Sequence, residues 1–200
     1  MADFDGLRVV ILAAGLGRRL GRDKATLPWG ASTLLEHVLR QFPPERLAAR
    51  VVVANLANQA AVAALVGAAD KVVVNPDPGS DMLVSVRLGV AALPPGPGPV
   101  CVHPVDVFAV SGELVSLLHE AWRADRERIH LPEVAARGAH PVLIPASLLA
   151  AIEAIPAGRG LDYLLEAFAD RVVRHRWYDR RLLVDLDTPE EYARHRPAGG

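Results

Sequence analysis

The feature that most constrains the fold is a short apolar run near the start of the chain. Residues Leu7–Ala14 (LRVVILAA) are almost continuously aliphatic, and the run stops at Gly15. Such a run does not alternate between apolar and polar residues, so it fits a strand that is buried on both faces. Strands of this kind occur in parallel sheets that carry helices on both sides. The run therefore predicts an α/β protein.

The same rhythm of strand and helix continues through the first half of the chain. Further buried strands are expected at Arg50–Ala54, Lys71–Val74 and Val100–His103. The helices between and after them are expected from Ser32-Thr33 to Phe42, at Ala57–Ala68, at about Asp81 to Leu93, and from Ser111 to about Arg123. Alternating strands and helices predict a three-layer α/β/α, Rossmann-like fold with a mostly parallel sheet.

The second half departs from this rhythm. Strands are expected at Glu133–Arg137, Val142–Ile144, Arg171–Trp177 and Leu182–Leu186, with helices at Ala146–Ile155, Leu161–Ala169 and Thr188–Arg194. The chain has 200 residues, which is an ordinary size for one unit with one core. We therefore expect a single domain spanning residues 1–200.

Charge and cysteine content exclude several classes of protein. The 22 Lys and Arg residues nearly balance 23 Asp and Glu residues, so no general basic field favours nucleic acid or an anionic membrane. Cys101 is the only cysteine, which excludes an internal disulfide framework and a cysteine-rich zinc site. The sequence has neither an apolar run long enough to span a bilayer nor a signal-peptide pattern. We expect a cytoplasmic protein with no nucleic-acid or membrane partner.

The predicted sheet brings three loops together. In a doubly wound sheet, ligands bind at the carboxyl ends of the strands. The loops after Ala14, Val74 and His103 should therefore share one rim. The second of these begins with a turn-forming sequence, Asn75-Pro76-Asp77-Pro78-Gly79.

The first loop combines glycine with positive charge. It contains Gly15, Gly17 and Gly21, and its cations are Arg18, Arg19, Arg22 and Lys24. Backbone N–H groups beside glycines can approach an anion closely, so a triphosphate is the expected guest. The spacing matches neither the dinucleotide G-x-G-x-x-G pattern nor a Walker loop. The alternative interpretation is a flexible connection with solvated arginines. Lys24 favours the phosphate site, because Lys71 is the only other lysine in a chain that otherwise uses arginine.

Five motifs in order carry a family resemblance. They are Leu12-Ala13-Ala14-Gly15-Leu16-Gly17-Arg18-Arg19-Leu20-Gly21-Arg22-Asp23-Lys24, Asn75-Pro76 with Gly79–Gly89, Val102-His103-Pro104-Val105-Asp106, Gly138-Ala139-His140-Pro141-Val142, and Asp185–Tyr192. Together they resemble nucleotidyltransferases with the glycosyltransferase-A-like fold. Within these they are most similar to the MobA/MocA-like molybdenum cofactor guanylyl- and cytidylyltransferases.

The resemblance implies a division of roles among the residues. Arg19, Lys24 and Asp106 would be catalytic, with Arg19 and Lys24 embracing the triphosphate. Asp106 would hold Mg²⁺, with Asp185 or Asp187 as a second carboxylate. Nucleotide and acceptor would be bound by Leu12, Ala13, Ala14, Gly15, Gly17, Arg18, Asn75, Gly79, Ser80, Ser85 and His140. Alanine at position 14 implies CTP rather than GTP as the donor.

Each of these roles has a structural alternative. Asp106 could be a residue of the turn at the strand end, and Asp187-Thr188-Pro189-Glu190 also matches a helix start. Ser85 could bond to its own helix backbone, and His140 could be structural. His103, within an apolar run, is interpreted as a core side chain with satisfied hydrogen bonds.

The predicted reaction is transfer of a nucleoside monophosphate from a nucleoside triphosphate to a phosphorylated acceptor. The resemblance implies molybdopterin as acceptor, with a molybdenum hydroxylase as a possible partner. After Asp106 the family usually has a polar residue and then proline, whereas this chain has Val107-Phe108. The alternatives are a sugar or polyol phosphate acceptor, a non-catalytic molybdenum-enzyme accessory protein, and a dinucleotide-binding oxidoreductase.

Overall fold

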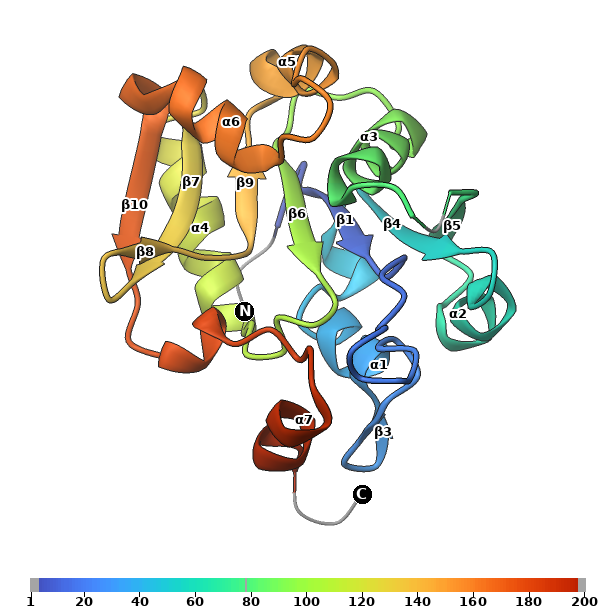
Figure 1. The fold of residues 1–200 in the computed structure, drawn as a ribbon. Coiled ribbons are helices and arrows are strands. Elements are labelled where there is room, and N and C mark those ends of the chain that lie inside the picture. Colours follow the sequence, from blue (N-terminus) through green and yellow to red (C-terminus); the bar gives the residue numbers. More distant parts are fainter. Residues whose placement is uncertain (1–3, 78, 198–200) are drawn as a thin grey trace.

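Four parallel strands form the centre of the fold, as the sequence predicts. In the computed structural model, which describes residues 4–77 and 79–197, β1 (Arg8–Leu12) lies between β4 (Ala49–Asn55) and β6 (Val100–Pro104). Strand β5 (Asp70–Asn75) flanks β4. Strand order reverses between β1 and β6 (Figure 1). In sheets of this kind, ligands bind in a crevice at such a reversal. Pro78 of the expected turn and Met1–Asp3 lie outside the described residues.

The sheet continues beyond β6 with mixed strand directions. Strands β9 (Val142–Ile144) and β6 are antiparallel, as are β7 (Ile129–Val134) and β9, and β10 (Val172–Arg176) runs parallel to β7 at the edge. The expected strand at Glu133–Arg137 is wrong. The chain turns there at Ala135 and Ala136, both with positive φ, into the short strand β8 (Arg137–Gly138). This backbone suits a two-residue hairpin turn, but alanine does not signal it in a sequence.

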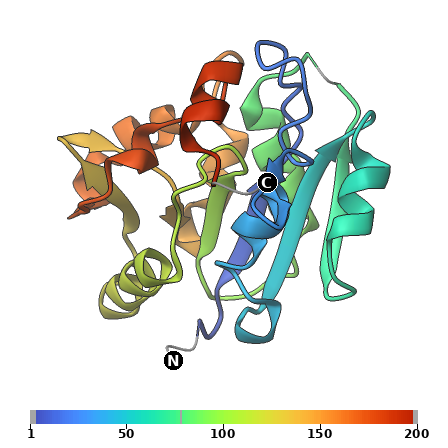
Figure 2. The same ribbon diagram turned by 90° about the horizontal axis from the view of Figure 1, so that it is seen from below.

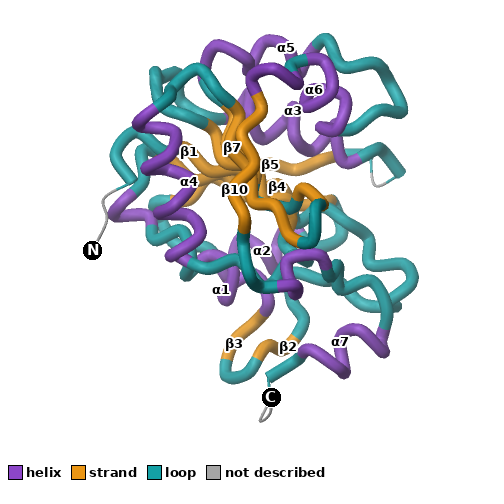
Figure 3. The backbone as a smooth tube through the Cα atoms, turned by 90° about the vertical axis from the view of Figure 1, so that its left-hand side faces the viewer, coloured by secondary structure: helices purple, strands orange, loops and turns teal. Residues whose placement is uncertain are grey.

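Helices cover both faces of the sheet, which confirms the three-layer architecture (Figure 3). One face carries α3 (Met82–Ala92), α5 (Leu149–Glu153) and α6 (Leu161–Ala167), and the other carries α1 (Leu34–Leu39), α2 (Gln59–Leu65) and α4 (Gly112–Ala124). Side chains from alternate positions of β1 divide between the two cores. Thr33 caps α1 with Glu36 in a capping box, and Ser111 caps α4, as expected.

The remaining segments are short. A hairpin of β2 (Pro28–Trp29) and β3 (Ser32–Thr33) precedes α1, and 3-10 turns lie at Pro44–Arg46, Ala146–Leu148, Ala169–Arg171 and Arg180–Leu183. The last of these replaces the strand expected at Leu182–Leu186. The Asp179 side chain accepts a hydrogen bond from Arg181 N, which starts the turn. The chain then passes to α7 (Pro189–His195), which lies beside the loop that follows β1 (Figure 2).

Within residues 4–77 and 79–197, no helix is long and apolar enough to cross a membrane.

Helix α3 crosses the sheet closely at a glycine. A Cβ added at Gly89 would overlap Val10 Cγ1 and would lie 3.0 Å from Val53 Cγ2. Both valines belong to the central strands and are buried. Glycine is therefore required here by close packing. The close packing at Gly89 allows the first turn of α3, with Met82 and Ser85, to lie at the pocket.

Gly89→Ala should destabilise the protein. Alanine gains roughly 1 kcal/mol over glycine in a helix, but overpacking of a core costs about 1–3 kcal/mol. We expect the free energy of unfolding to fall, which urea denaturation would measure. Gly112→Ala is the control, because a Cβ at Gly112 meets nothing within 4 Å. Equal stability of the two variants would show that α3 shifts away from the sheet at no cost.

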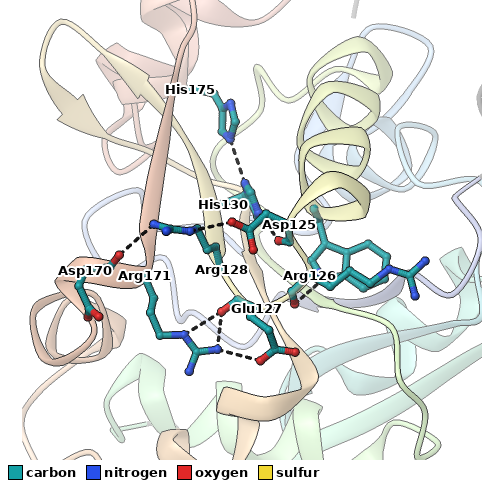
Figure 4. A network of polar contacts seen from close by, with 9 residues as sticks. Asp125, Arg126, Glu127, Arg128, His130, Asp170, Arg171 and His175 are labelled. Carbon is teal, nitrogen blue, oxygen red and sulfur yellow. Dashed lines mark hydrogen bonds and ion pairs between the residues drawn. The ribbon is translucent and has the colours of Figure 1, made fainter.

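A polar network joins β7 to the edge strand β10 (Figure 4). His130 Nδ1 and His175 Nε2 lie 3.0 Å apart with their rings stacked, and His130 Nε2 donates to the Asp125 carbonyl at 3.1 Å. Arg128 bonds to the Asp125 carboxylate. His130 Nδ1 therefore accepts a hydrogen bond that His175 Nε2–H donates. Burial lowers the pKa of both histidines, and the nearby Arg128 also lowers that of His130.

Stability should fall as the pH drops below 7. The unfolded chain takes up protons near the ordinary histidine pKa of 6.5, whereas the folded chain keeps both rings neutral until the pH reaches their lowered pKa values. His175→Gln keeps a donor for His130 but removes one titrating group. Its free energy of unfolding should depend less on pH between 7 and 5 than that of the unchanged protein. Parallel curves for the two would contradict this account.

Candidate active site

A pocket of about 360 Å³ opens at the carboxyl ends of β1, β5 and β6. Thirteen of the residues predicted for the site line it: Leu12, Ala14, Gly15, Gly17, Arg18, Arg19, Lys24, Asn75, Gly79, Ser80, Ser85, Asp106 and Asp187. These residues come from distant parts of the chain, so their convergence is a property of the fold. Asp77 and Met82 also line the pocket and were not among the predicted residues.

The glycine-rich loop after β1 has the backbone that its sequence suggests. Gly17 has φ of +56°, and an added Cβ there would overlap the carbonyl of Arg22. The Gly21 N–H donates to the Gly17 carbonyl at 2.8 Å, which closes the loop on itself. The closed loop exposes Arg18 and Arg19 and returns the chain to Lys24, which is buried.

Two asparagines from the end of β4 hold the start of this loop. Asn58 Nδ2 donates to the Ala13 carbonyl at 2.8 Å and to Asp23 Oδ2 at 2.6 Å. Asn55 Nδ2 donates to the Ala14 carbonyl at 3.0 Å. Sequence reasoning missed both asparagines. Their signal was available, since Asn55 ends the strand adjacent to β1 and so reaches the same rim.

Lys24 bridges two carboxylates at the floor of the pocket. Its Nζ lies 2.6 Å from Asp106 Oδ2 and 2.6 Å from Asp187 Oδ1, and its side chain is only 11% exposed. Arg19 forms a further ion pair with Asp187, but its side chain is 71% exposed. One lysine thus joins the loop after β1, the end of β6 and the segment before α7.

The electrostatics of this cluster favour its charged forms. Burial alone would lower the pKa of Lys24, but the charges and hydrogen bonds of Asp106 and Asp187 raise it above its ordinary value. Burial would raise the pKa of Asp187, yet the bonds and charges of Lys24 and Arg19 hold it below its ordinary value. The lysine is therefore an ammonium group, and Asp187 is ionised at neutral pH.

Backbone bonds fix the two carboxylates relative to each other. The Leu186 N–H donates to the Asp106 carbonyl at 3.4 Å, and the Asp187 N–H donates to the Glu191 carboxylate at 2.9 Å. Glu191 is also part of the capping box of α7 with Thr188. The helix-start alternative for Asp187-Thr188-Pro189-Glu190 is thus correct for Thr188. It does not replace the role of the Asp187 carboxylate in the pocket.

Asp106 and Asp187 are the residues that could hold a metal ion. Both carboxylates reach one point, now taken by the ammonium of Lys24. No cluster of three or more His, Cys, Asp or Glu side chains suited to a metal occurs in the part of the chain that the structure describes. A site with two carboxylates still fits Mg²⁺, which keeps waters and takes phosphate oxygens. Asp185 is not among the lining residues; partial burial, together with the Asp106 and Asp187 charges, raises the pKa of its carboxyl.

Neutral side chains shape the wall formed by β5 and α3. Asn75 Nδ2 donates to Ser80 Oγ at 2.9 Å and to Ser85 Oγ at 3.0 Å. Ser85 is buried, so its hydroxyl is held by Asn75 rather than left to solvent. Met82 is 55% exposed at the mouth of the same wall. These groups offer hydrogen bonds and an apolar surface but no net charge.

Two predicted binding residues lie outside the lining of the pocket. Ala13 is buried, and its carbonyl accepts from Asn58. His140 lies behind Asp106, with Nδ1 3.4 Å from the Val102 carbonyl, and burial lowers the pKa of its ring. The structure therefore favours the structural alternative for His140.

A known protein family matches most of this chain. The model of the MobA-like NTP transferase domain matches residues 9–174, which is most of the chain and includes the loop after β1 and Asp106. The chain belongs to the MobA-like NTP transferase domain family.

Individual relatives are similar over different lengths. A probable molybdenum cofactor guanylyltransferase of Mycobacterium avium (strain 104) is 58% identical over 41 residues, 20% of this chain and 21% of that protein. The solved structure of Rv0371c from Mycobacterium tuberculosis H37Rv has a TM-score of 0.83 at 22% identity, covering 94% of this chain and 97% of the other. A structure described as the manganese complex of Rv0371c gives 0.78 at 21% identity, with 94% and 97% covered. The structural likeness confirms the fold.

Asn58→Ala should loosen the loop of this NTP transferase domain. The variant loses the bonds to the Ala13 carbonyl and to Asp23, and unpaired buried groups cost about 1–3 kcal/mol. We expect faster tryptic cleavage after Arg18, Arg19 and Arg22, followed by mass spectrometry. Gln59→Ala, at the exposed neighbouring position, should cleave at the original rate. Unchanged cleavage in Asn58→Ala would mean that the glycine turns alone hold the loop.

Proposed function

We propose that this chain transfers a nucleoside monophosphate from a nucleoside triphosphate to molybdopterin, in a reaction that depends on Mg²⁺ and releases pyrophosphate. The observation that carries the proposal is the buried Lys24 between Asp106 and Asp187, beside a glycine-rich loop with three exposed arginines. Family membership supports the donor class. The acceptor is supported by the mycobacterial relative, which is named as a molybdenum cofactor enzyme.

The chemistry explains why such a pocket needs both signs of charge. An oxygen of the acceptor phosphate attacks the α-phosphorus of the nucleotide. The bond from that phosphorus to the bridging oxygen breaks, and the electron pair leaves with pyrophosphate. All the reacting groups are anionic, so Arg18, Arg19 and Lys24 would offset their repulsion and stabilise the charge of the transition state. No covalent intermediate with the protein is needed, because positioning supplies the rest of the acceleration.

Asp106 and Asp187 would hold the divalent cation. Bound there, Mg²⁺ would supply positive charge that offsets the negative charge of the phosphates and of the leaving group. The manganese complex of Rv0371c supports a divalent ion in a protein of this fold. Lys24 would then exchange its two carboxylate partners for phosphate oxygens. Asp185, with its raised pKa, is the less suitable ligand.

Two observations differ on which base the donor nucleotide carries. Ala14 in the loop after β1 favours CTP by family resemblance, whereas the relative of 58% identity over 41 residues is named a guanylyltransferase. The wall formed by Gly79, Ser80, Met82 and Ser85 would face the base or the acceptor. Both nucleotides therefore belong in the first experiment.

The test is turnover with purified molybdopterin, MgCl₂ and either CTP or GTP, with pyrophosphate release measured. We expect release with one nucleotide, and loss of at least 100-fold in kcat for Asp106→Asn, because removal of a group that stabilises transition-state charge costs roughly that much. Asp170→Asn is the control, since Asp170 is exposed and does not line the pocket.

Other outcomes would replace the proposal. Release with a sugar or polyol phosphate but not with molybdopterin would change the acceptor. No release with any acceptor, together with binding to a molybdenum hydroxylase, would favour the accessory-protein alternative. Stabilisation by NAD alone would favour the oxidoreductase.

Lys24→Met should raise the affinity of the protein for divalent ions. Without the ammonium group, Asp106 and Asp187 face each other, so the variant should be less stable and should bind Mn²⁺ more tightly. Tenfold tighter binding adds about 1.4 kcal/mol at saturating concentration and raises the unfolding midpoint by a few degrees. Lys71→Met is the control, because Lys71 is exposed and bonds only to the Ala92 carbonyl. Equal Mn²⁺ shifts in all three proteins would show that the two carboxylates hold no metal.

A further inference from the structure

The turn that carries Asp106 is held from the core by a buried histidine. His103 is fully buried in β6, three residues before Asp106, and its Nε2 lies 3.0 Å from the Val107 carbonyl oxygen. A carbonyl only accepts hydrogen bonds, so Nε2 carries the proton and donates it. The bond thus ties the residue after Asp106 back to the strand that leads into it.

Other bonds hold the same turn from its two ends. The Val105 N–H donates to the Leu12 carbonyl at 3.0 Å, and the Val107 N–H donates to the Pro104 carbonyl at 3.3 Å. His37 of α1 donates from Nε2 to the Phe108 carbonyl at 2.9 Å. Both carbonyls that follow Asp106 are therefore bonded to histidine side chains.

Burying the His103 ring costs free energy, and this cost indicates that the residue serves to make the bond to the Val107 carbonyl. The ring is in the core, as expected, but the expectation that its hydrogen bonds are satisfied is wrong for Nδ1, which is buried and has no hydrogen-bond partner among the described residues. The ring packs against Phe42 at 5.7 Å and lies edge-on to His140 at 6.5 Å. An aliphatic side chain would fill this space without leaving a nitrogen unpaired. Burial lowers the pKa of His103 to about 3, so the ring stays neutral.

The sequence after Asp106 explains why such a bond is needed. Val107 and Phe108 stand where the family usually has a polar residue and proline, so no ring restricts the backbone. Both side chains are buried instead, at 2% and 4% exposure. Burial of these side chains and the two hydrogen bonds from histidines restrict the backbone after Asp106 instead.

We propose that His103 is a positioning residue for Asp106, holding the carboxylate in place for metal and nucleotide through the Val107 carbonyl. This inference rests on the proposed function. It extends that function by assigning a role to a residue that touches neither the pocket nor any ligand. Changes in groups that orient a metal ligand typically cost 10- to 100-fold in metal affinity or activity.

The experiment compares three variants of the full chain. His103→Leu removes the donor, and His103→Gln places an amide N–H where Nε2 lies. His119→Leu is the matched control, because His119 is buried in α4 and its Nε2 lies 3.1 Å from the Asp5 carbonyl, away from the site. Mn²⁺ affinity is measured by electron paramagnetic resonance in the presence of a non-hydrolysable nucleotide, and kcat, KM and unfolding midpoint are measured alongside.

The expected pattern separates positioning from folding. His103→Leu and His119→Leu should both lower the unfolding midpoint. Only His103→Leu should weaken Mn²⁺ binding and reduce kcat by about 10- to 100-fold, and His103→Gln should recover most of both. Normal Mn²⁺ affinity and kcat in folded His103→Leu would overturn the positioning role alone. Failure of the unchanged protein to bind Mn²⁺ with nucleotide would overturn the proposed function and this role with it.

Discussion

The Lys24 ammonium group between Asp106 and Asp187 is the interaction on which the rest of the site depends. Lys24 belongs to the loop after β1, and its two partners belong to the end of β6 and to the segment before α7, so the three residues are far apart in the sequence. A lysine buried to this degree is costly unless it is paired, so the two carboxylates must be brought close to it. The strand-order reversal between β1 and β6 creates the opening, and the segment before α7 brings Asp187 to it.

Around this cluster, neutral side chains hold the structure of the pocket, whereas charged side chains face its interior. Asn55, Asn58 and the Asn75–Ser85 bond hold backbone and walls, and they do so without adding charge. Arg19, Lys24, Asp106 and Asp187 face the pocket and pair with one another. An incoming ligand can exchange partners with the charged groups while the amides keep the loop in shape.

Local signals in the sequence were sufficient for the first half of the fold. Strands β1, β4 and β6 are buried on both faces, so their apolar runs are nearly continuous, whereas β5 is only partly buried. Thr33 and Ser111 marked helix starts through their own side-chain bonds. The second half depends on long-range contacts. Ala135 and Ala136 adopt positive φ because the β7–β8 pairing requires it, and Leu182–Leu186 is drawn away from the sheet toward Asp106. Thirteen of the residues that the motifs singled out line the pocket, yet the motifs could not show that Asn58 supports the loop or that Lys24 bridges Asp106 and Asp187.

The charge balance of the pocket argues for a cation as part of its function. Of the described lining residues, Arg18, Arg19 and Lys24 are cationic, and Asp77, Asp106 and Asp187 are anionic. These charges cancel before any ligand enters. A triphosphate and a phosphorylated acceptor both add negative charge, and the carboxylates at the floor would repel them. In a pocket that bound anions alone, Asp106 and Asp187 at that position would weaken binding by charge repulsion. In the proposed reaction, a divalent cation between the carboxylates and the phosphates would resolve this conflict.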